Sequence, residues 1–208
     1  AILIGLVGSE MCIRDRIERN TNKIIKKLHE REGNDKAILS ALRRSNSILS
    51  RQATIVWPML FEYIKEKDTF GENSRQTTSE RAIFTALRCY AVFEQGNDVE
   101  RDREYDNENA MSLFRSLSFL RKDEQLREAL DRRVRAVLST TNAEVVTRSL
   151  VSLTKIIKAN NPAASINYPE LANDIYNFQL GFEPARKVAI KWGREYFWIN
   201  DNKESNED

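Results

Sequence analysis

The chain has 208 residues, of which 41% are apolar and 31% are charged, with only seven glycines and four prolines, and this composition favours a helical globular protein over a turn-rich β fold. A formal net charge of +2 gives no overall bias towards a polyanion partner, and the sequence contains no run of about 18 apolar residues that would predict a membrane span. Two cysteines make no disulfide framework and fit a reducing cytoplasm.

The first segment, residues 1–16, differs from the rest of the chain. It is apolar and contains glycine, then becomes abruptly charged, and it begins without methionine. It resembles translated adapter or vector sequence, and we predict that it is a non-native leader. A genuine N-terminal strand or helix cap is the alternative.

From residue 17 onwards the apolar residues follow a helical spacing, and residues 17–96 are predicted to form an N-terminal helical half. A glycine–asparagine pair after residue 32 breaks the first helix. The next helix runs to the Arg43–Arg44 pair, where a helix C-terminus favours cations. Pro58 suits the first position of a short helix, and a polar loop is expected over residues 65–78.

The stretch Ser79–Gly96 is predicted to be a central helix around which the others pack. Hydroxyl side chains at residues 77–79 can cap its start, where the helix dipole also favours Glu80. Gly96 can adopt the positive φ that ends many helices. Apolar residues recur at helical spacing, and two phenylalanines widen the apolar face, so we expect deep burial.

A highly charged connector over residues 97–109 is the expected boundary to a C-terminal helical bundle, residues 110–199. The helices predicted in this bundle cover residues 110–120, 123–138, 142–158, 169–180 and 184–199. Residues 200–208 carry no sizeable apolar side chain and are expected to be a disordered acidic tail. The predicted fold is therefore all-α, a compact bundle of about eight or nine helices, with a division into two helical halves as an option.

The sequence offers little for catalysis. Its one histidine, His29, lies on a lysine-rich helix and is expected to be a surface residue, since a catalytic base needs a positioned partner. Histidine and cysteine do not cluster as zinc ligands, and no phosphate-binding glycine loop or nucleophile elbow occurs. We therefore expect no enzyme activity, no metal, no cofactor and no small-molecule substrate. The core is the expected place for Trp57 and Trp192.

The distribution of charge is more informative than the net charge. Residues 94–108 carry seven acids and two bases, a net charge of −5, whereas residues 115–158 carry ten bases and five acids, a net charge of +5. On the predicted helices Arg132 and Lys155 point away from the apolar faces, while Arg133 falls among apolar positions, as a packed arginine paired with an acid would. Such basic faces can neutralise phosphates, but solvated faces with i,i+4 ion pairs are the more common explanation.

Several short segments between residues 17 and 197 resemble those of a known protein family, and they occur along the chain in the same order as in that family. They are Ala41–Arg44, Trp57–Phe61, Glu80–Arg88 followed by Tyr90, Phe114–Leu117, Arg132–Val134, Leu153–Lys158, Asp174–Tyr176 and Trp192–Phe197. Together they resemble the CasB family, the small subunit of the type I-E CRISPR surveillance complex called Cascade, which acts in antiviral defence. No single segment is as specific as a metal motif, but their joint order is hard to obtain by chance.

The resemblance implies an all-helical, non-catalytic protein, present in two copies beside the guide RNA and the other Cascade subunits. Its basic faces would stabilise the target DNA strand paired with the guide and the displaced strand of the R-loop. The resemblance assigns nucleic-acid binding to Arg43, Arg44, Arg115, Arg132, Arg133, Lys155, Lys158 and Arg194, and the helix faces add Arg148 and Lys191. Members often have an arginine pair where this chain has Val151 and Ser152, so Arg148 and Lys155 would have to substitute for it.

The alternative is a helical adaptor that binds only other proteins, through the acidic connector, the acidic tail and exposed aromatic residues of the last helix. Salt dependence separates the two functions. A phosphate binder loses about 0.7–0.9 log unit of affinity per log unit of salt for each phosphate neutralised, whereas an aromatic protein interface does not. A metal-dependent nuclease, the third class, would cleave nucleic acid in magnesium or manganese.

Overall fold

The computed structural model describes residues 2–30, 35–64, 76–96 and 109–197. Within these ranges the chain forms nine α-helices, one 3-10 helix and a single isolated bridge, so the all-α prediction is confirmed. The elements are α1 (Ile2–Glu30), α2 (Asp35–Arg44), η1 (Arg51–Val56), α3 (Trp57–Tyr63), α4 (Thr78–Phe93), α5 (Leu113–Leu120), α6 (Glu124–Ser139), α7 (Ala143–Asn160), α8 (Tyr168–Phe178) and α9 (Phe182–Phe197).

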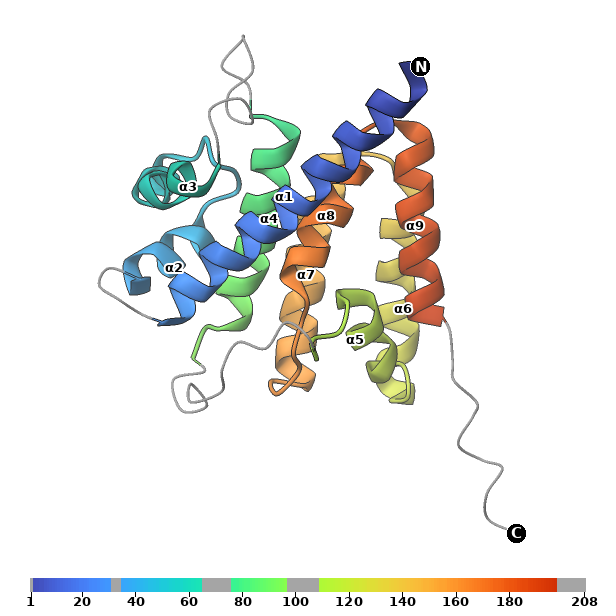
Figure 1. Cartoon of the computed structure of the whole chain (residues 1–208). Coiled ribbons are helices and arrows are strands. Elements are labelled where there is room, and N and C mark those ends of the chain that lie inside the picture. The colour runs from blue at the N-terminus through green and yellow to red at the C-terminus, as the bar shows by residue number, and fades with distance from the viewer. Residues whose placement is uncertain (1, 31–34, 65–75, 97–108, 198–208) are drawn as a thin grey trace.

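Helix α4 lies at the centre of the molecule, as predicted, and packs against α8, α7, α2 and α1 (Figure 1). All of its residues except Thr78 and Arg81 are buried. The Thr77 hydroxyl accepts a hydrogen bond from the Glu80 N–H at 3.1 Å, and the Glu80 carboxylate accepts one from the Thr77 N–H at 2.9 Å. This capping box satisfies first-turn donors that have no partner within the helix. Beyond the other end, Gly96 has the predicted positive φ of 82°.

Local side-chain caps also start the helices of the C-terminal half. The side chains that accept hydrogen bonds from first-turn N–H groups are those of Ser112, Asp123, Asn142 and Asn167. The prediction that α5 begins at residue 110 is wrong by three residues. Met111 instead forms a parallel bridge with Ile166, in which the Met111 N–H donates to the Ser165 carbonyl at 3.0 Å. The backbone before Ser112 is therefore extended.

One hydrophobic core contains residues from both sides of residues 97–108. Trp192 is buried in it, with its ring stacked on Phe114 and Phe178 at centroid distances of 4.7 and 5.8 Å, as expected. Trp57 is partly buried at the edge of the core, where its indole N–H donates to the Ile48 carbonyl at 3.0 Å. The predicted connector, apart from residue 109, and the predicted acidic tail lie outside the described residues.

Helix α1 continues without a break through residue 16, where the sequence suggests the end of a leader. From Ile17 onwards its apolar side chains enter the core, namely Ile17, Ile24, Ile25 and Leu28. Glu18 accepts a hydrogen bond from the Asn173 amide at 2.6 Å and so connects α1 with α8. None of the described helices is long and apolar enough to span a membrane.

Candidate nucleic-acid interface

The C-terminal end of α4 brings together two of the predicted cations. The Arg43 guanidinium, from α2, donates to the Ala91 carbonyl at 3.2 Å, and the Lys158 ammonium, from α7, donates to the Val92 carbonyl at 3.2 Å and to the Gln95 carbonyl. The last carbonyls of a helix lack intrahelical partners and carry partial negative charge, so both cations stabilise this end. Burial lowers the pKa of both side chains, and the charge of Arg43 lowers the pKa of Lys158 further.

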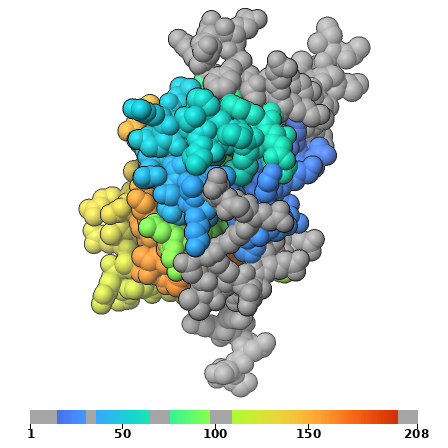
Figure 2. All heavy atoms as spheres, turned by 90° about the vertical axis from the view of Figure 1, so that its left-hand side faces the viewer, coloured from blue at the N-terminus to red at the C-terminus, as the bar shows by residue number. Residues whose placement is uncertain are grey.

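Two exposed cations adjoin this pair. Arg44 is exposed at the end of α2, and its guanidinium donates to the Ser40 carbonyl of its own helix at 3.4 Å. Lys155 lies one turn before Lys158, and no group among the described residues forms a hydrogen bond or ion pair with its ammonium. Figure 2 shows α2, the end of α4 and α7 side by side on one face. We call Arg43, Arg44, Lys155 and Lys158 the α2–α7 edge.

Arg148 extends the exposed face of α7 away from this edge. It lies seven residues before Lys155, which places the two cations about 10 Å apart along one helix face. Arg148 is exposed and forms an ion pair with Glu144 at 3.2 Å. Between them Val151 is buried, as its apolar side chain requires, whereas Ser152 is exposed. Only one of these two positions could therefore present a cation to a ligand.

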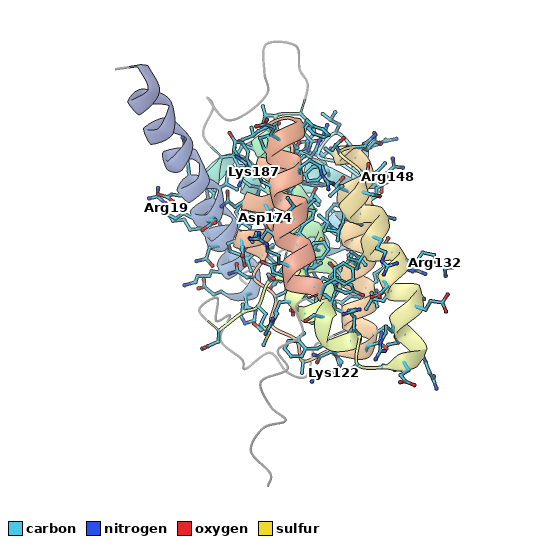
Figure 3. The ribbon with its side chains drawn as sticks, turned by 90° about the vertical axis from the view of Figure 1, so that its right-hand side faces the viewer. Arg19, Lys122, Arg132, Arg148, Asp174 and Lys187 are labelled. Carbon is cyan, nitrogen blue, oxygen red and sulfur yellow. The ribbon has the colours of Figure 1, made fainter. Side chains whose placement is uncertain are left out.

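Helix α6 presents Arg132 and Arg133 to solvent. The expectation that Arg133 is packed among apolar residues is wrong, because the helix buries only a narrow stripe. That stripe consists of Leu130, Val134 and Val137. Figure 3 shows Arg132 of α6 and Arg148 of α7 projecting from the same side of the molecule.

The two predicted cations of α9 differ in their surroundings. The Lys191 ammonium lies 2.7 Å from a Glu170 oxygen, 2.9 Å from both Asp174 oxygens and 4.0 Å from a Glu195 oxygen. Burial opposes its charge, but Asp174 and Glu170 outweigh burial and raise the pKa of Lys191. Arg194 is exposed instead. Lys191 is therefore bound to internal carboxylates, whereas Arg194 is available to a partner.

The sequence does not single out Arg121, which follows α5 and is held by hydrogen bonds to an acid of α6. Its guanidinium donates to the two Asp131 oxygens at 2.8 and 3.2 Å, and the Tyr196 hydroxyl donates to the same carboxylate at 2.6 Å. Burial alone would raise the pKa of Asp131, but these hydrogen bonds lower it. No helical spacing joins these residues, so only the packing of α5, α6 and α9 reveals them. The half-buried Arg115 lies with its guanidinium 5.8 Å from the Phe119 ring centre.

Two residues with potentially reactive side chains, His29 and Cys89, lie against or within the central helix α4. His29 is half-buried rather than a surface residue, because its ring lies against α4 with Nδ1 3.5 Å from the Tyr90 hydroxyl. Cys89 is fully buried in α4, and burial raises the pKa of its thiol to about 11. Across the part of the chain that the structure describes, no three histidine, cysteine or acidic side chains are grouped as metal ligands.

The two lysines of the α2–α7 edge allow a direct test of this geometry. Replacing Lys158 with methionine is expected to lower the free energy of unfolding by about 1 kcal/mol, because the carbonyls at the end of α4 lose a charged donor. The matched substitution Lys155→Met, one turn away and exposed, should change it by less than about 0.5 kcal/mol. Urea unfolding followed by circular dichroism measures both, and equal effects would contradict the assignment.

Fold and charge pattern together define a class: an all-helical protein whose exposed cations lie on the faces of packed helices. The family model of the CRISPR-associated protein Cse2 matches residues 38–197. The chain belongs to this family, the Cse2 or CasB family, which confirms the resemblance read from its segments.

Solved structures share the fold. The crystal structure of CasB from Thermobifida fusca superposes with a TM-score of 0.62 at 19% identity, over 88% of this chain and 97% of that one. A chain from a CRISPR RNA-guided surveillance complex gives a TM-score of 0.63 at 19% identity, over 86% of this chain and 92% of that one. No curated protein sequence matches this chain.

Proposed function

We propose that the chain is a non-catalytic small subunit of a CRISPR RNA-guided surveillance complex. Two copies of the chain are present in each complex. Their basic helix faces contact the hybrid of guide RNA and target DNA, and also the displaced strand. Membership of the Cse2 family and the likeness to a chain of such a complex support the proposal that this chain assembles into a surveillance complex. The observation that carries the nucleic-acid contact is the α2–α7 edge, where two exposed cations adjoin two anchored ones.

The α2–α7 edge suits a phosphate backbone for a physical reason. Arg43 and Lys158 neutralise the end of α4, so the neighbouring charges of Arg44 and Lys155 remain available. Contacts between such side chains and phosphates are strong at low salt and carry no sequence information. Base pairing with the guide then reads the sequence, and protein contacts to the backbone favour a strand exchange that is otherwise nearly balanced. Exposed Arg132, Arg133, Arg148 and Arg194 are further contact residues of this proposal.

The double variant Arg44→Ala/Lys155→Ala tests the proposal in the assembled complex with guide RNA. Binding of target DNA should weaken to a similar degree for all target sequences. The slope of log affinity against log salt should become less steep by about 2, because each phosphate contact contributes about 1. Both side chains are exposed, so the unfolding midpoint of the isolated chain should not change.

The matched control is Lys23→Ala/Lys26→Ala, which removes two exposed charges from α1. Since neither lysine belongs to the α2–α7 edge, this variant should bind target DNA like the wild type. A complex in which the edge variant keeps both the affinity and the salt slope would contradict the proposal and favour the adaptor function.

A further inference from the structure

Two groups of exposed rings and arginines lie on α5, α6 and α9, and both α5 and α6 pack against α9. The Phe197 ring, 37% exposed, has the Arg121 and Arg135 guanidinium groups 5.0 and 6.0 Å from its centre. On α5 the Phe119 side chain is 43% exposed and lies below Arg115 at 5.8 Å. We call these two groups, Arg115 with Phe119 and Arg121 and Arg135 with Phe197, the arginine–aromatic cluster. It lies on different helices from the α2–α7 edge.

The cluster is partly rigid and remains positively charged. Asp131 fixes Arg121 through two hydrogen bonds and itself accepts a third from the Tyr196 hydroxyl, so this guanidinium is held in place before any ligand arrives. Asp131 is the carboxylate in contact with the cluster. In the described part of the chain, neither Arg115 nor Arg135 forms an ion pair with an acid. Lys122, which follows Arg121, and Arg132, which follows Asp131, add exposed positive charge.

We infer that the arginine–aromatic cluster binds the unpaired bases of a single-stranded nucleic acid. Exposed rings and guanidinium planes stack with bases, and Arg115 and Arg135 neutralise the adjoining phosphates. This inference rests on the proposed function and deepens it, because it adds a contact with bases to the contacts with phosphates. Since every base has a stacking face, the cluster should accept most sequences.

The observations favour a nucleic acid over a protein partner. Aromatic residues and arginine are enriched in protein interfaces as well, so the local charge, and not the residue types, separates the two partners. Among the described residues, the three arginines of the cluster have one carboxylate, Asp131, paired with them, and exposed Lys122 and Arg132 add positive charge, which favours a polyanion. Stacking combined with phosphate neutralisation uses both the exposed rings and this positive charge, whereas an apolar partner would have to desolvate the arginines.

The test compares two single-stranded oligonucleotides of equal length, one with ordinary bases and one with abasic sites that keep every phosphate. Fluorescence anisotropy measures their binding to the full chain at low salt. We expect the wild type to bind the ordinary strand about tenfold more tightly than the abasic strand. The variant Phe119→Leu/Phe197→Leu keeps apolar side chains but lacks the two aromatic stacking faces, so it should lose most of this preference.

Phe182→Leu is the matched control, because Phe182 is 72% exposed but lies at the opposite end of α9. It should keep the tenfold preference, and thermal melts should show that every variant is folded. A wild type that binds both strands equally, or binds neither, overturns the inference, while the proposed phosphate contacts are judged separately in the assembled complex. If the double variant keeps its preference but no longer co-purifies with the other subunits, the cluster is a protein interface and the inference is wrong.

Discussion

Replacing Trp192 with alanine is expected to lower the free energy of unfolding by about 3–5 kcal/mol. The indole is 1% exposed, and it is stacked between Phe114 of α5 and Phe178 of α8. Removing it leaves a cavity where α5, α8 and α9 meet, and the two remaining rings, held by α5 and α8, cannot readily collapse into that space. The indole N–H also donates to the buried Asp174 carboxylate at 2.8 Å, so that acid loses a donor.

Trp192→Phe separates packing from the hydrogen bond. Phenylalanine keeps an aromatic ring in the stack but cannot donate to Asp174, so we expect a loss of about 1–3 kcal/mol. Urea unfolding followed by far-ultraviolet circular dichroism measures both variants against the wild type. If Trp192→Ala cost less than about 1 kcal/mol, the region between these helices would not be the well-packed core that the structure shows.

The sequence predicts those parts of the fold that depend on local chemistry. Asp123 and Asn142 cap the two helices whose predicted ranges begin at these residues, because a cap needs only a side-chain acceptor close to the first-turn N–H groups. The burial of α4 follows from its apolar spacing and its two added phenylalanines. Family membership could also be read from short segments in a fixed order.

Contacts between distant segments could not be predicted, because they depend on how helices pack. The start of α5 shifts because Met111 bridges to Ile166, which lies 55 residues further along the chain. Lys191 resembles a surface cation in the sequence, yet α8 places two acids beside it. Arg43 and Lys158 meet only because α2 and α7 both pack against α4. Arg44 and Lys155 are exposed, and no packing contact among the described residues assigns a role to them, so their binding of nucleic acid stays a prediction.

Replacing Lys191 with methionine is expected to lower the free energy of unfolding by about 2–3 kcal/mol at neutral pH. Breaking a fully buried ion pair costs about 3–5 kcal/mol, and the smaller value applies because the Lys191 side chain is 38% exposed and partly screened by water. The variant leaves Asp174, whose side chain is only 9% exposed, without its counter-charge. Lys187→Met is the matched control, one turn away and exposed, and should change stability by less than about 0.5 kcal/mol.

The pH dependence of this loss identifies its cause. Burial already raises the pKa of Asp174 in the wild type, against the opposing effects of Lys191 and Trp192. Without the Lys191 ammonium the pKa of Asp174 rises further. When a carboxyl group has a higher pKa in the folded state than in the unfolded state, the free energy of unfolding falls as the pH rises from the unfolded-state pKa through the folded-state pKa. The deficit of the Lys191→Met variant should therefore be small near pH 4, where the unfolded carboxyl is still largely protonated, and should grow as the pH rises towards 7. Lys191 itself stays charged over this range because its pKa is raised. A deficit of equal size at both pH values would mean that lost packing of the lysine side chain, and not the uncompensated carboxylate, destabilises the variant.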